Sequence, residues 1–201
     1  MTRTPEGPLG SERRQWNPRR VVVIGNTGSG KSTFGAALAS KLGVAYTDSD
    51  DLFWLPGWQE RPNDEFRAAL DDATRGEGWV LVGNYLSRAT DITWPRADTI
   101  VWLDLSLPLV VSRSVRRTAK RAITRQVVCN GNTEKLRFLL PERLGGEKPL
   151  WHYAIDHHRI HRPRIETMLS DATRDDLTVH RLRSRADVAR FLGADSGLTD
   201  R

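Results

Sequence analysis

Residues 21–42 read VVVIGNTGSGKSTFGAALASKL: a β-branched run, a glycine-rich loop and an amphipathic segment. The loop matches the pattern G-x-x-x-x-G-K-[ST] without a mismatch, between a predicted strand (20–25) and a predicted helix (31–42). Glycines let backbone N–H groups turn toward phosphate oxygens, and the N-terminus of the helix favours negative charge. We therefore expect ATP phosphates to bind Gly25, Asn26, Thr27, Gly28, Ser29, Gly30, Lys31, Ser32 and Thr33.

Two residues of this loop have chemical roles that follow from their side chains. Lys31 is expected to reach the β- and γ-phosphates and to act catalytically, and Ser32 is expected to offer its hydroxyl to Mg²⁺. A chance glycine turn would not explain both the preceding strand and the following helix. The sequence therefore predicts ATP and Mg²⁺ as cofactors.

Phosphoryl transfer also needs a carboxylate opposite Ser32, at the end of a neighbouring strand. The third predicted strand (79–82) ends in Val82, which cannot serve, whereas the second (44–47) runs into Asp48-Ser49-Asp50. If strand geometry persists, both carboxylates lie on the same side, at the sheet edge where open α/β folds bind ligands. We assign Asp48 to Mg²⁺ and Asp50 to the acceptor hydroxyl. A solvated turn with a helix-capping aspartate is the alternative for either residue.

Strands and helices alternate along the chain, which predicts an α/β fold with a parallel sheet and right-handed crossovers. Besides those already given, the predicted elements are strands at 99–104 and 177–182 and helices from 63 or 64 to 75, from 107 onward and at 185–192. The segment 127–148 is irregular and long for a plain connection, which favours a lid.

A basic stripe precedes this lid. From 113 to 125 there are six basic residues and no acidic one, opposite an expected apolar side of Val111, Val115, Ala119, Ala122 and Ile123. Arginines here would stabilise the transferring phosphoryl group, and we choose Arg117 and Arg121 as catalytic candidates, with Arg125 also considered. For most of the stripe a solvated face is the simpler interpretation.

Composition limits the remaining classes of function. The chain has 201 residues, one cysteine, a net charge of +6 and no apolar run long enough for a membrane span, so we expect a cytoplasmic protein without a membrane partner. We interpret Cys129 as an incidental thiol, and the four histidines at 152–161 as a helix surface near the lid rather than a zinc site. The arginines at the N-terminus leave a nucleic-acid partner open, but no recognition motif favours one.

The motifs together resemble the adenylate-kinase-like small P-loop kinases, which include nucleoside monophosphate, shikimate and gluconate kinases. The segments DSDDLFWLPGWQERPNDEF, GNY, RADTIVWLDL and LTVHRLRSRADVARFL are similar to bacterial proteins described as adenylate-kinase-like or DNA topology modulation proteins. The resemblance spans roughly 20–192 and implies a P-loop NTPase with a five-stranded parallel sheet, helices on both faces and a lid insertion. The closer group reads Asp where this chain has Val82.

The resemblance also implies an acceptor side. Asp48 and Asp50 resemble the D-x-D of shikimate kinase, and Gly83-Asn84 resembles its glycine-rich acceptor loop. Arg88 loosely matches an arginine that would clamp an acceptor phosphate, and Trp54 follows the acidic turn, where it would stack on the acceptor or pack in the core.

We therefore expect a flexible arm (1–18), one kinase-like domain (19–193) with an acceptor-side segment at about 51–76 and a lid at about 121–149, and a tail (194–201). The expected activity is an ATP- and Mg²⁺-dependent phosphotransferase for a small-molecule acceptor, with a nucleoside monophosphate favoured. The alternatives are a kinase of a small sugar- or cyclitol-like hydroxyl compound, and a nucleotide-binding, DNA-associated regulator with little kinase activity. No obligate protein partner is evident.

Overall fold

The computed structural model describes residues 18–140, 149–172 and 174–193. Almost all of the predicted arm (1–18), part of the predicted lid (141–148) and the predicted tail (194–201) lie outside the described residues.

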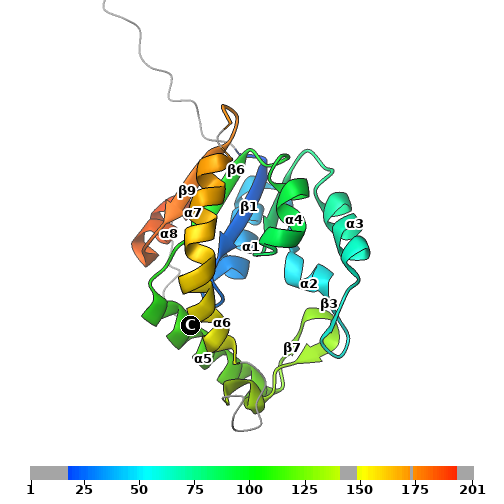
Figure 1. Ribbon diagram of the computed structural model, residues 1–201, viewed down its shortest axis with the longest axis vertical. Coiled ribbons are helices and arrows are strands. Elements are labelled where there is room, and N and C mark those ends of the chain that lie inside the picture. The colour runs from blue at the N-terminus through cyan, green and yellow to red at the C-terminus, as the bar shows by residue number, and fades with distance from the viewer. Residues whose placement is uncertain (1–17, 141–148, 173, 194–201) are drawn as a thin grey trace, which may run out of the picture.

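A five-stranded parallel sheet forms the centre of the molecule (Figure 1), as the sequence predicts. Its strand order is β2-β5-β1-β6-β9, so the chain leaves the centre and returns through crossover helices. The strands are β1 (Arg20–Gly25), β2 (Ala45–Asp48), β5 (Trp79–Val82), β6 (Thr99–Leu103) and β9 (Thr178–Leu182). β1, β5 and β6 are nearly continuous apolar runs, which is typical of strands that are covered on both faces.

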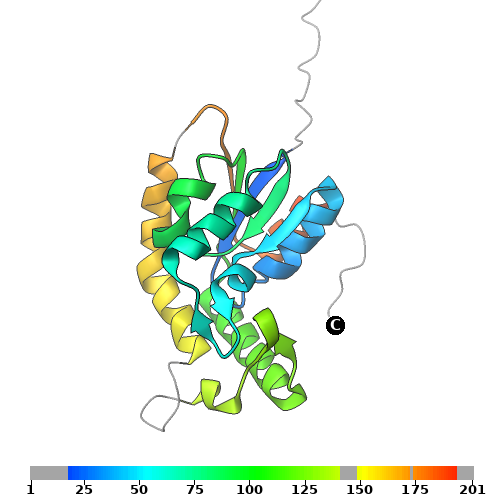
Figure 2. The ribbon, with the colours of Figure 1, turned by 90° about the vertical axis from the view of Figure 1, so that its right-hand side faces the viewer.

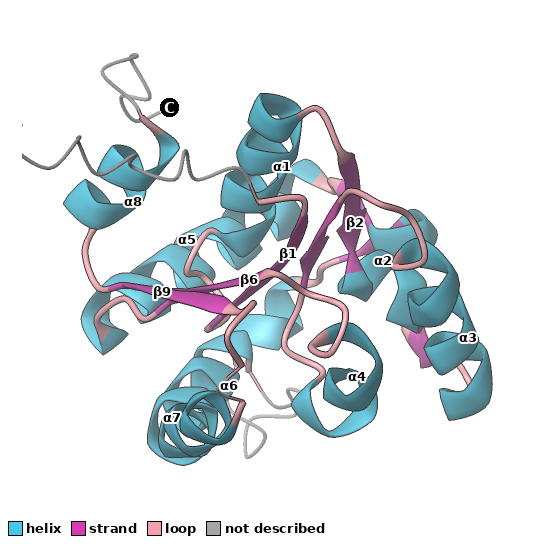
Figure 3. Cartoon of the chain, turned by 90° about the horizontal axis from the view of Figure 1, so that it is seen from above, coloured by secondary structure: helices cyan, strands magenta, loops and turns pink. Residues whose placement is uncertain are grey.

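Helices cover the two faces of the sheet as separate layers, which Figure 3 shows from above. One layer contains α1 (Lys31–Leu42) and α8 (Arg185–Leu192), packed on Val21, Val23 and their neighbours. The other contains α3 (Asn63–Ala73), α4 (Leu86–Thr93) and α7 (Arg162–Asp171), packed on Val22 and Ile24. The alternation of burial along β1 therefore builds two hydrophobic cores, one on each side of the sheet.

Helix α1 approaches β5 very closely because position 35 is a glycine. A Cβ built on Gly35 would lie 2.3 Å from Cγ2 of Val82, so any larger residue would push the helix away. Since α1 follows directly from the phosphate-binding loop, this contact helps to fix where that loop lies.

The carboxyl ends of the strands point toward a second group of elements at the lower end of the molecule (Figure 2). The long helix α5 (Leu107–Thr124) leads into the short antiparallel pair β7 (Val127–Val128) and β8 (Asn132–Thr133) and the 3-10 turn η2 (Leu136–Leu139). A second hairpin, β3 (Trp54–Leu55) with β4 (Gln59–Glu60), comes from the predicted acceptor-side segment. Within the part of the chain that the structure describes, no helix is long and apolar enough to cross a membrane.

Three details differ from the sequence-based expectations. The second strand ends at Asp48 and the short helix α2 (Ser49–Phe53) begins at once, so strand geometry does not continue to Asp50. Helix α4 was not predicted. The predicted apolar side of α5 is wrong in orientation: Val115 and Ile123 are exposed, while Val110, Ser114 and Thr118 are buried. The inward face is set by a tertiary neighbour: a Cβ on Gly28 would lie 2.3 Å from the carbonyl oxygen of Val110, so this side of α5 meets the phosphate-binding loop.

Candidate active site

The phosphate-binding loop connects β1 to α1 and adopts positive φ angles at its glycines. Gly28 has φ 79°, and a Cβ there would lie 2.3 Å from the carbonyl oxygen of Val110, so the loop lies directly on α5. Gly30 is the N-cap of α1 with φ 91°. The first residues of α1 therefore offer their N–H groups at the carboxyl edge of the sheet, where an anion is favoured.

Lys31 folds back over the same loop. Its Nζ donates a 3.0 Å hydrogen bond to the carbonyl oxygen of Asn26. Desolvation by the surrounding protein lowers its pKa; Asp50 and Asp48 oppose this shift, and Arg117 adds to it. A cation with so few solvent contacts at the mouth of a phosphate-binding loop is suited to interact with phosphate oxygens.

Other loop residues are also tied to the surrounding structure. Asn26 is buried and its Nδ2 donates a 2.7 Å hydrogen bond to the carbonyl oxygen of Ala154, while the N–H of Ser29 donates to Asn26 at 3.1 Å. Thr27 Oγ1 accepts a hydrogen bond from Arg117, and Thr33 is exposed in the first turn of α1. The loop is thus held from α5 on one side and from α6 (Leu150–Asp156) on the other.

Ser32 and Asp48 meet at the position predicted for Mg²⁺. The Ser32 Oγ donates a 2.7 Å hydrogen bond to Oδ2 of Asp48, and the Tyr46 hydroxyl lies 3.3 Å from the same oxygen. A hydroxyl and a carboxylate in contact, with Ser32 open to solvent, fit a hard cation that keeps several waters and binds phosphate oxygens. In the described ranges no three His, Cys, Asp or Glu side chains are grouped so that they could hold a metal ion by themselves.

Asp48 also caps α2, because its Oδ1 accepts a 3.1 Å hydrogen bond from the N–H of Asp50. The metal and capping interpretations of Asp48 are therefore compatible: one carboxylate oxygen faces Ser32 and the other holds the helix.

Asp50 lies beside this pair on the acceptor side. Its Oδ1 accepts a 2.8 Å hydrogen bond from the Tyr85 hydroxyl. The side chain keeps contact with solvent. Desolvation by the surrounding protein, followed by the charge of Asp48, raises the pKa of Asp50. The hydrogen bond from Tyr85 and the charge of Lys31 oppose this shift. A carboxylate with a raised pKa is suited to accept a proton from an acceptor hydroxyl.

The amide of Asn84, a predicted substrate-binding residue, forms hydrogen bonds to the phosphate-binding loop. Its Oδ1 accepts a 2.9 Å hydrogen bond from the N–H of Gly25, and its Nδ2 donates to the carbonyl oxygen of the same glycine. The remaining N–H of Nδ2 is directed at Nε2 of His157, 2.9 Å away. Asn84 therefore connects the acceptor loop to the start of the phosphate-binding loop, while neighbouring Gly83 has φ 155° against Ser49.

His157 is a site residue that the sequence reasoning missed. It begins the π-helical turn η4 (His157–His161) between α6 and α7, and its ring is half-buried beside the phosphate-binding loop. The signal in the sequence was the run of histidines, which we interpreted as a helix surface near the lid rather than a zinc site. Contact with Asn84, 73 residues earlier, has no local pattern that would reveal it.

The two predicted catalytic arginines lie in different surroundings. Arg117 Nη2 lies 3.2 Å from Thr27 Oγ1, and burial, followed by the charge of Arg121, lowers its pKa. Arg121 instead forms a 2.8 Å ion pair with Glu134, whose side chain is almost fully buried. Of the two, Arg117 reaches the phosphate-binding loop, whereas Arg121 ties α5 to the lid. Arg125 is exposed at the end of α5 with φ 49°.

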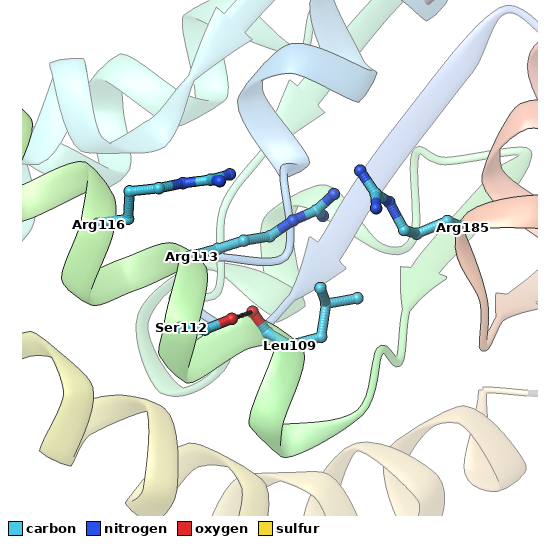
Figure 4. A pocket seen from close by; sticks show the side chains of 5 residues that line it. All are labelled: Leu109, Ser112, Arg113, Arg116 and Arg185. Carbon is cyan, nitrogen blue, oxygen red and sulfur yellow. Dashed lines mark hydrogen bonds between the residues drawn. The ribbon is translucent and has the colours of Figure 1, made fainter. Parts of the chain in front are cut away.

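A shallow hollow of about 190 Å³ lies next to the loop, between α5 and the start of α8 (Figure 4). Arg113 and Arg185 point toward one another across it, and Arg116 extends from the same side as Arg113. Its floor contains Leu109 and Ser112. Because Gly28 contacts Val110 on the same turn of α5, this hollow is close to where a bound nucleotide would leave the loop.

The aromatic acceptor-side residues mostly pack on each other. Trp54 makes edge contacts with Phe53 and Trp58, at ring-centroid distances of 4.9 and 5.6 Å. Arg88 forms a 3.1 Å ion pair with Glu60 and lies 4.9 Å above the Phe53 ring. The predicted role of Arg88 as a clamp for an acceptor phosphate therefore competes with a carboxylate partner that it already has.

The lid hairpin contacts this acceptor-side hairpin through two asparagines. Nδ2 of Asn130 donates to the carbonyl oxygens of Asp51 and Trp54, at 2.7 and 2.6 Å. Nδ2 of Asn132 donates to the carbonyl oxygen of Leu55 at 3.0 Å, and its Oδ1 accepts from the N–H of Trp58. We call these contacts the asparagine latch. Cys129 lies beside it, and burial raises the pKa of this thiol to about 12, which makes it unreactive.

Comparison with known proteins supports the same fold. No family model matches the chain. The shikimate kinase of Mycobacterium tuberculosis (strain ATCC 25177 / H37Ra) is 31% identical over 140 residues, which cover 62% of this chain and 76% of the relative. That of Vibrio campbellii is 26% identical over 157 residues, covering 69% and 84%. A solved shikimate kinase from Acinetobacter baumannii, in complex with shikimate, superposes with a TM-score of 0.56 at 15% identity, covering 87% of this chain and 89% of that one.

Proposed function

The chain belongs to the small P-loop kinases of the shikimate kinase type, and we propose that it transfers the γ-phosphoryl group of ATP to a hydroxyl of a small molecule. The observation that carries this proposal is the placement of Asp50. Its carboxylate lies next to the Ser32–Asp48 pair and accepts a hydrogen bond from the Tyr85 hydroxyl. The residue before Tyr85 is Asn84, whose side chain is hydrogen-bonded to Gly25. The donor loop and the acceptor carboxylate are thus fixed by two adjacent residues.

Each residue has a role in this mechanism. The phosphate-binding loop and Lys31 would hold the β- and γ-phosphates, and Arg117 would add positive charge where it develops during transfer. Ser32 and Asp48 would hold Mg²⁺, which when bound neutralises phosphate charge. Asp50 would orient the acceptor hydroxyl and accept its proton.

For the acceptor, we propose a small sugar- or cyclitol-like hydroxyl compound, the alternative in the sequence analysis, in place of the nucleoside monophosphate favoured there. The similarity to shikimate kinases supports this choice. So do two of the arginines on the acceptor side: Arg88 is paired with Glu60, and Arg67 forms a two-point ion pair with Asp91, at 2.9 and 2.5 Å. Neither is positioned to clamp an acceptor phosphate without leaving its present partner. The finer resemblance to adenylate-kinase-like proteins stays a prediction.

The deciding experiment is an acceptor screen. ADP release from ATP and Mg²⁺ would be measured with polyols and cyclitols, shikimate among them, and with nucleoside monophosphates, using Asp50→Asn as the control. We expect turnover with a hydroxyl compound that is lost in Asp50→Asn. ADP release at only the acceptor-free rate with every compound would contradict the proposal. The DNA-associated regulator is not favoured, because Arg117 and Arg121 are turned toward the loop and the lid.

A further inference from the structure

His157 and Asn84 form a contact between two segments that are far apart in the sequence. Nε2 of His157 is 2.9 Å from Nδ2 of Asn84, and a second ring, that of His161, stacks on His157 with centroids 5.2 Å apart. Burial, followed by the charges of Lys31, His161 and His158 and opposed by Asp104, lowers the pKa of His157 to about 3. The imidazole is therefore neutral at physiological pH.

The hydrogen-bonding capacity of Asn84 determines which nitrogen of His157 carries the proton. A carboxamide has two N–H donors and one oxygen acceptor. The oxygen of Asn84 accepts from the N–H of Gly25, and one N–H donates to the carbonyl of Gly25. The other N–H needs an acceptor, so Nε2 of His157 must be unprotonated and the ring proton must be on Nδ1.

A rotated Asn84 amide would place its NH₂ group against the N–H of Gly25 and its oxygen against the carbonyl of Gly25. Both contacts would be repulsive. The two backbone groups of Gly25 thus select the amide orientation. Nε2 of His157 accepts the N–H that this orientation leaves over, so the ring holds the amide in place from its other side.

The helical segment that carries His157 is connected to the phosphate-binding loop in two ways, one through Asn84 and one direct. Besides the link through Asn84, the carbonyl oxygen of Ala154 accepts a 2.7 Å hydrogen bond from Nδ2 of Asn26. The π-helical turn η4 begins at His157, and such turns add one residue to a helical turn and so change the direction of its side chains. Two consecutive loop residues, Gly25 and Asn26, are therefore supported from one short segment.

We propose that His157 is a positioning residue for the phosphate-binding loop: it fixes the Asn84 amide, and the amide fixes the first peptide of the loop. The nucleotide then meets a loop that is already ordered, which reduces the entropy lost on binding. This inference rests on the ATP-binding part of the proposed function and does not depend on the acceptor.

The first test compares three variants by titrating a fluorescent ATP analogue with Mg²⁺. His157→Phe keeps a ring but removes the acceptor, and we expect about 3- to 10-fold weaker binding, the effect of losing one hydrogen bond of roughly 0.5–1.5 kcal/mol. His157→Gln offers Oε1 to Asn84 and should recover most of the affinity. His161→Phe, which keeps the stack, should bind within about twofold of the parent chain, as expected when no hydrogen bond to the loop is removed.

Two results would overturn the proposal. One is unchanged binding in His157→Phe with an unchanged melting temperature. The other is an equal loss in His157→Gln and His157→Phe, which would mean that His157 acts only through packing.

A spectroscopic test is independent of binding. Long-range ¹⁵N NMR of the histidine-labelled protein should show the Nδ1–H tautomer at His157, unchanged on acidification to about pH 5, well above its lowered pKa. An Nε2–H tautomer would rule the proposal out. Because neither test uses an acceptor, an acceptor screen without turnover would count against the proposed function and leave this inference standing.

Discussion

Ser32 Oγ donates a 2.7 Å hydrogen bond to Oδ2 of Asp48, across the gap between the start of α1 and the end of β2. The two oxygens come from segments that meet only because β2 lies beside β5 and β5 beside β1. This contact joins the only metal-binding groups that we assign, and the first prediction concerns it.

Asp48→Asn should weaken the response to Mg²⁺. An amide oxygen carries no charge, so we expect the Mg²⁺ concentration for half-maximal turnover to rise and kcat to fall about 100-fold. A Mg²⁺ titration of ADP release measures both, with Asp64→Asn, on the exposed first turn of α3, as the matched control. The same Mg²⁺ response in both variants would exclude Asp48 from the metal site.

Lys31→Ala should remove most of the activity without unfolding the chain. The ammonium group contacts the loop carbonyl of Asn26 and would lie against the transferred phosphate, so we expect kcat to fall about 10²- to 10³-fold. Lys41→Ala is the control at the other end of α1, where Nζ bonds the carbonyl oxygen of Leu192. Full phosphotransfer by Lys31→Ala would disprove the mechanism.

Alanine substitutions at Arg117 and Arg121 should have different effects on kcat. Arg117 lies at the loop, so Arg117→Ala should lower kcat about 10- to 100-fold. Arg121 is paired with Glu134, so Arg121→Ala should act mainly on lid stability, seen as a lower melting temperature with a smaller change in kcat. Exposed Lys120 provides the control Lys120→Ala. If Arg121→Ala lost more kcat than Arg117→Ala, the assignment would have to be reversed.

The asparagine latch should govern how well the closed site excludes water. Asn130→Gly tolerates the φ of 53° found there but removes the amide that bonds Asp51 and Trp54. We expect a higher KM for the acceptor and faster ADP release without acceptor, because lid closure is what protects ATP from hydrolysis. Lys135→Ala on the same lid is the control. An unchanged acceptor-free rate would show that the latch does not control closure.

Asp104 should link stability to pH. Burial alone would raise the pKa of its carboxyl, but hydrogen bonds from Arg162 and Arg181 lower it below the usual value. A lowered pKa in the folded state means that the stabilisation is present at neutral pH and is lost as the pH falls through the acid range.

Asp104→Asn should therefore lower the free energy of unfolding by roughly 1–3 kcal/mol near pH 7. This cost is smaller than that of breaking a fully buried ion pair, because both arginines are partly exposed. The difference from the parent chain should shrink toward pH 3. Urea unfolding at several pH values measures it. A difference that stayed constant or grew on acidification would contradict the assignment.

Several parts of the fold could be predicted because the determining residues are close in sequence. The β-branched run at 21–24 and the loop after it define β1 and the start of α1, and Gly43 ends α1 as expected, with φ 66°. The same local reasoning found Asp48 and Ser32 as a pair. It placed Asp50 correctly next to them but for the wrong reason, since a helix begins at Ser49.

Other features depend on which surface a segment meets, and no local pattern contains that information. The periodicity of α5 was visible, but the face turned inward is the one with Ser114 and Thr118, because Gly28 of a distant loop packs on that side of the helix. In the same way, Asn84 was recognised as a site residue, but no local pattern revealed its partners. These are Gly25 and His157, which lie 59 and 73 residues away.

The asparagine latch has a consequence for how this protein could be redesigned. Asn130 and Asn132 bond main-chain oxygens of residues 51, 54 and 55, so these contacts do not depend on which side chains those positions carry. Substitutions at Trp54 and Leu55 would therefore leave the oxygens that accept the hydrogen bonds of Asn130 and Asn132 in place. A library randomised at these two positions would vary the side chains of one hairpin while its attachment to the other is inherited intact.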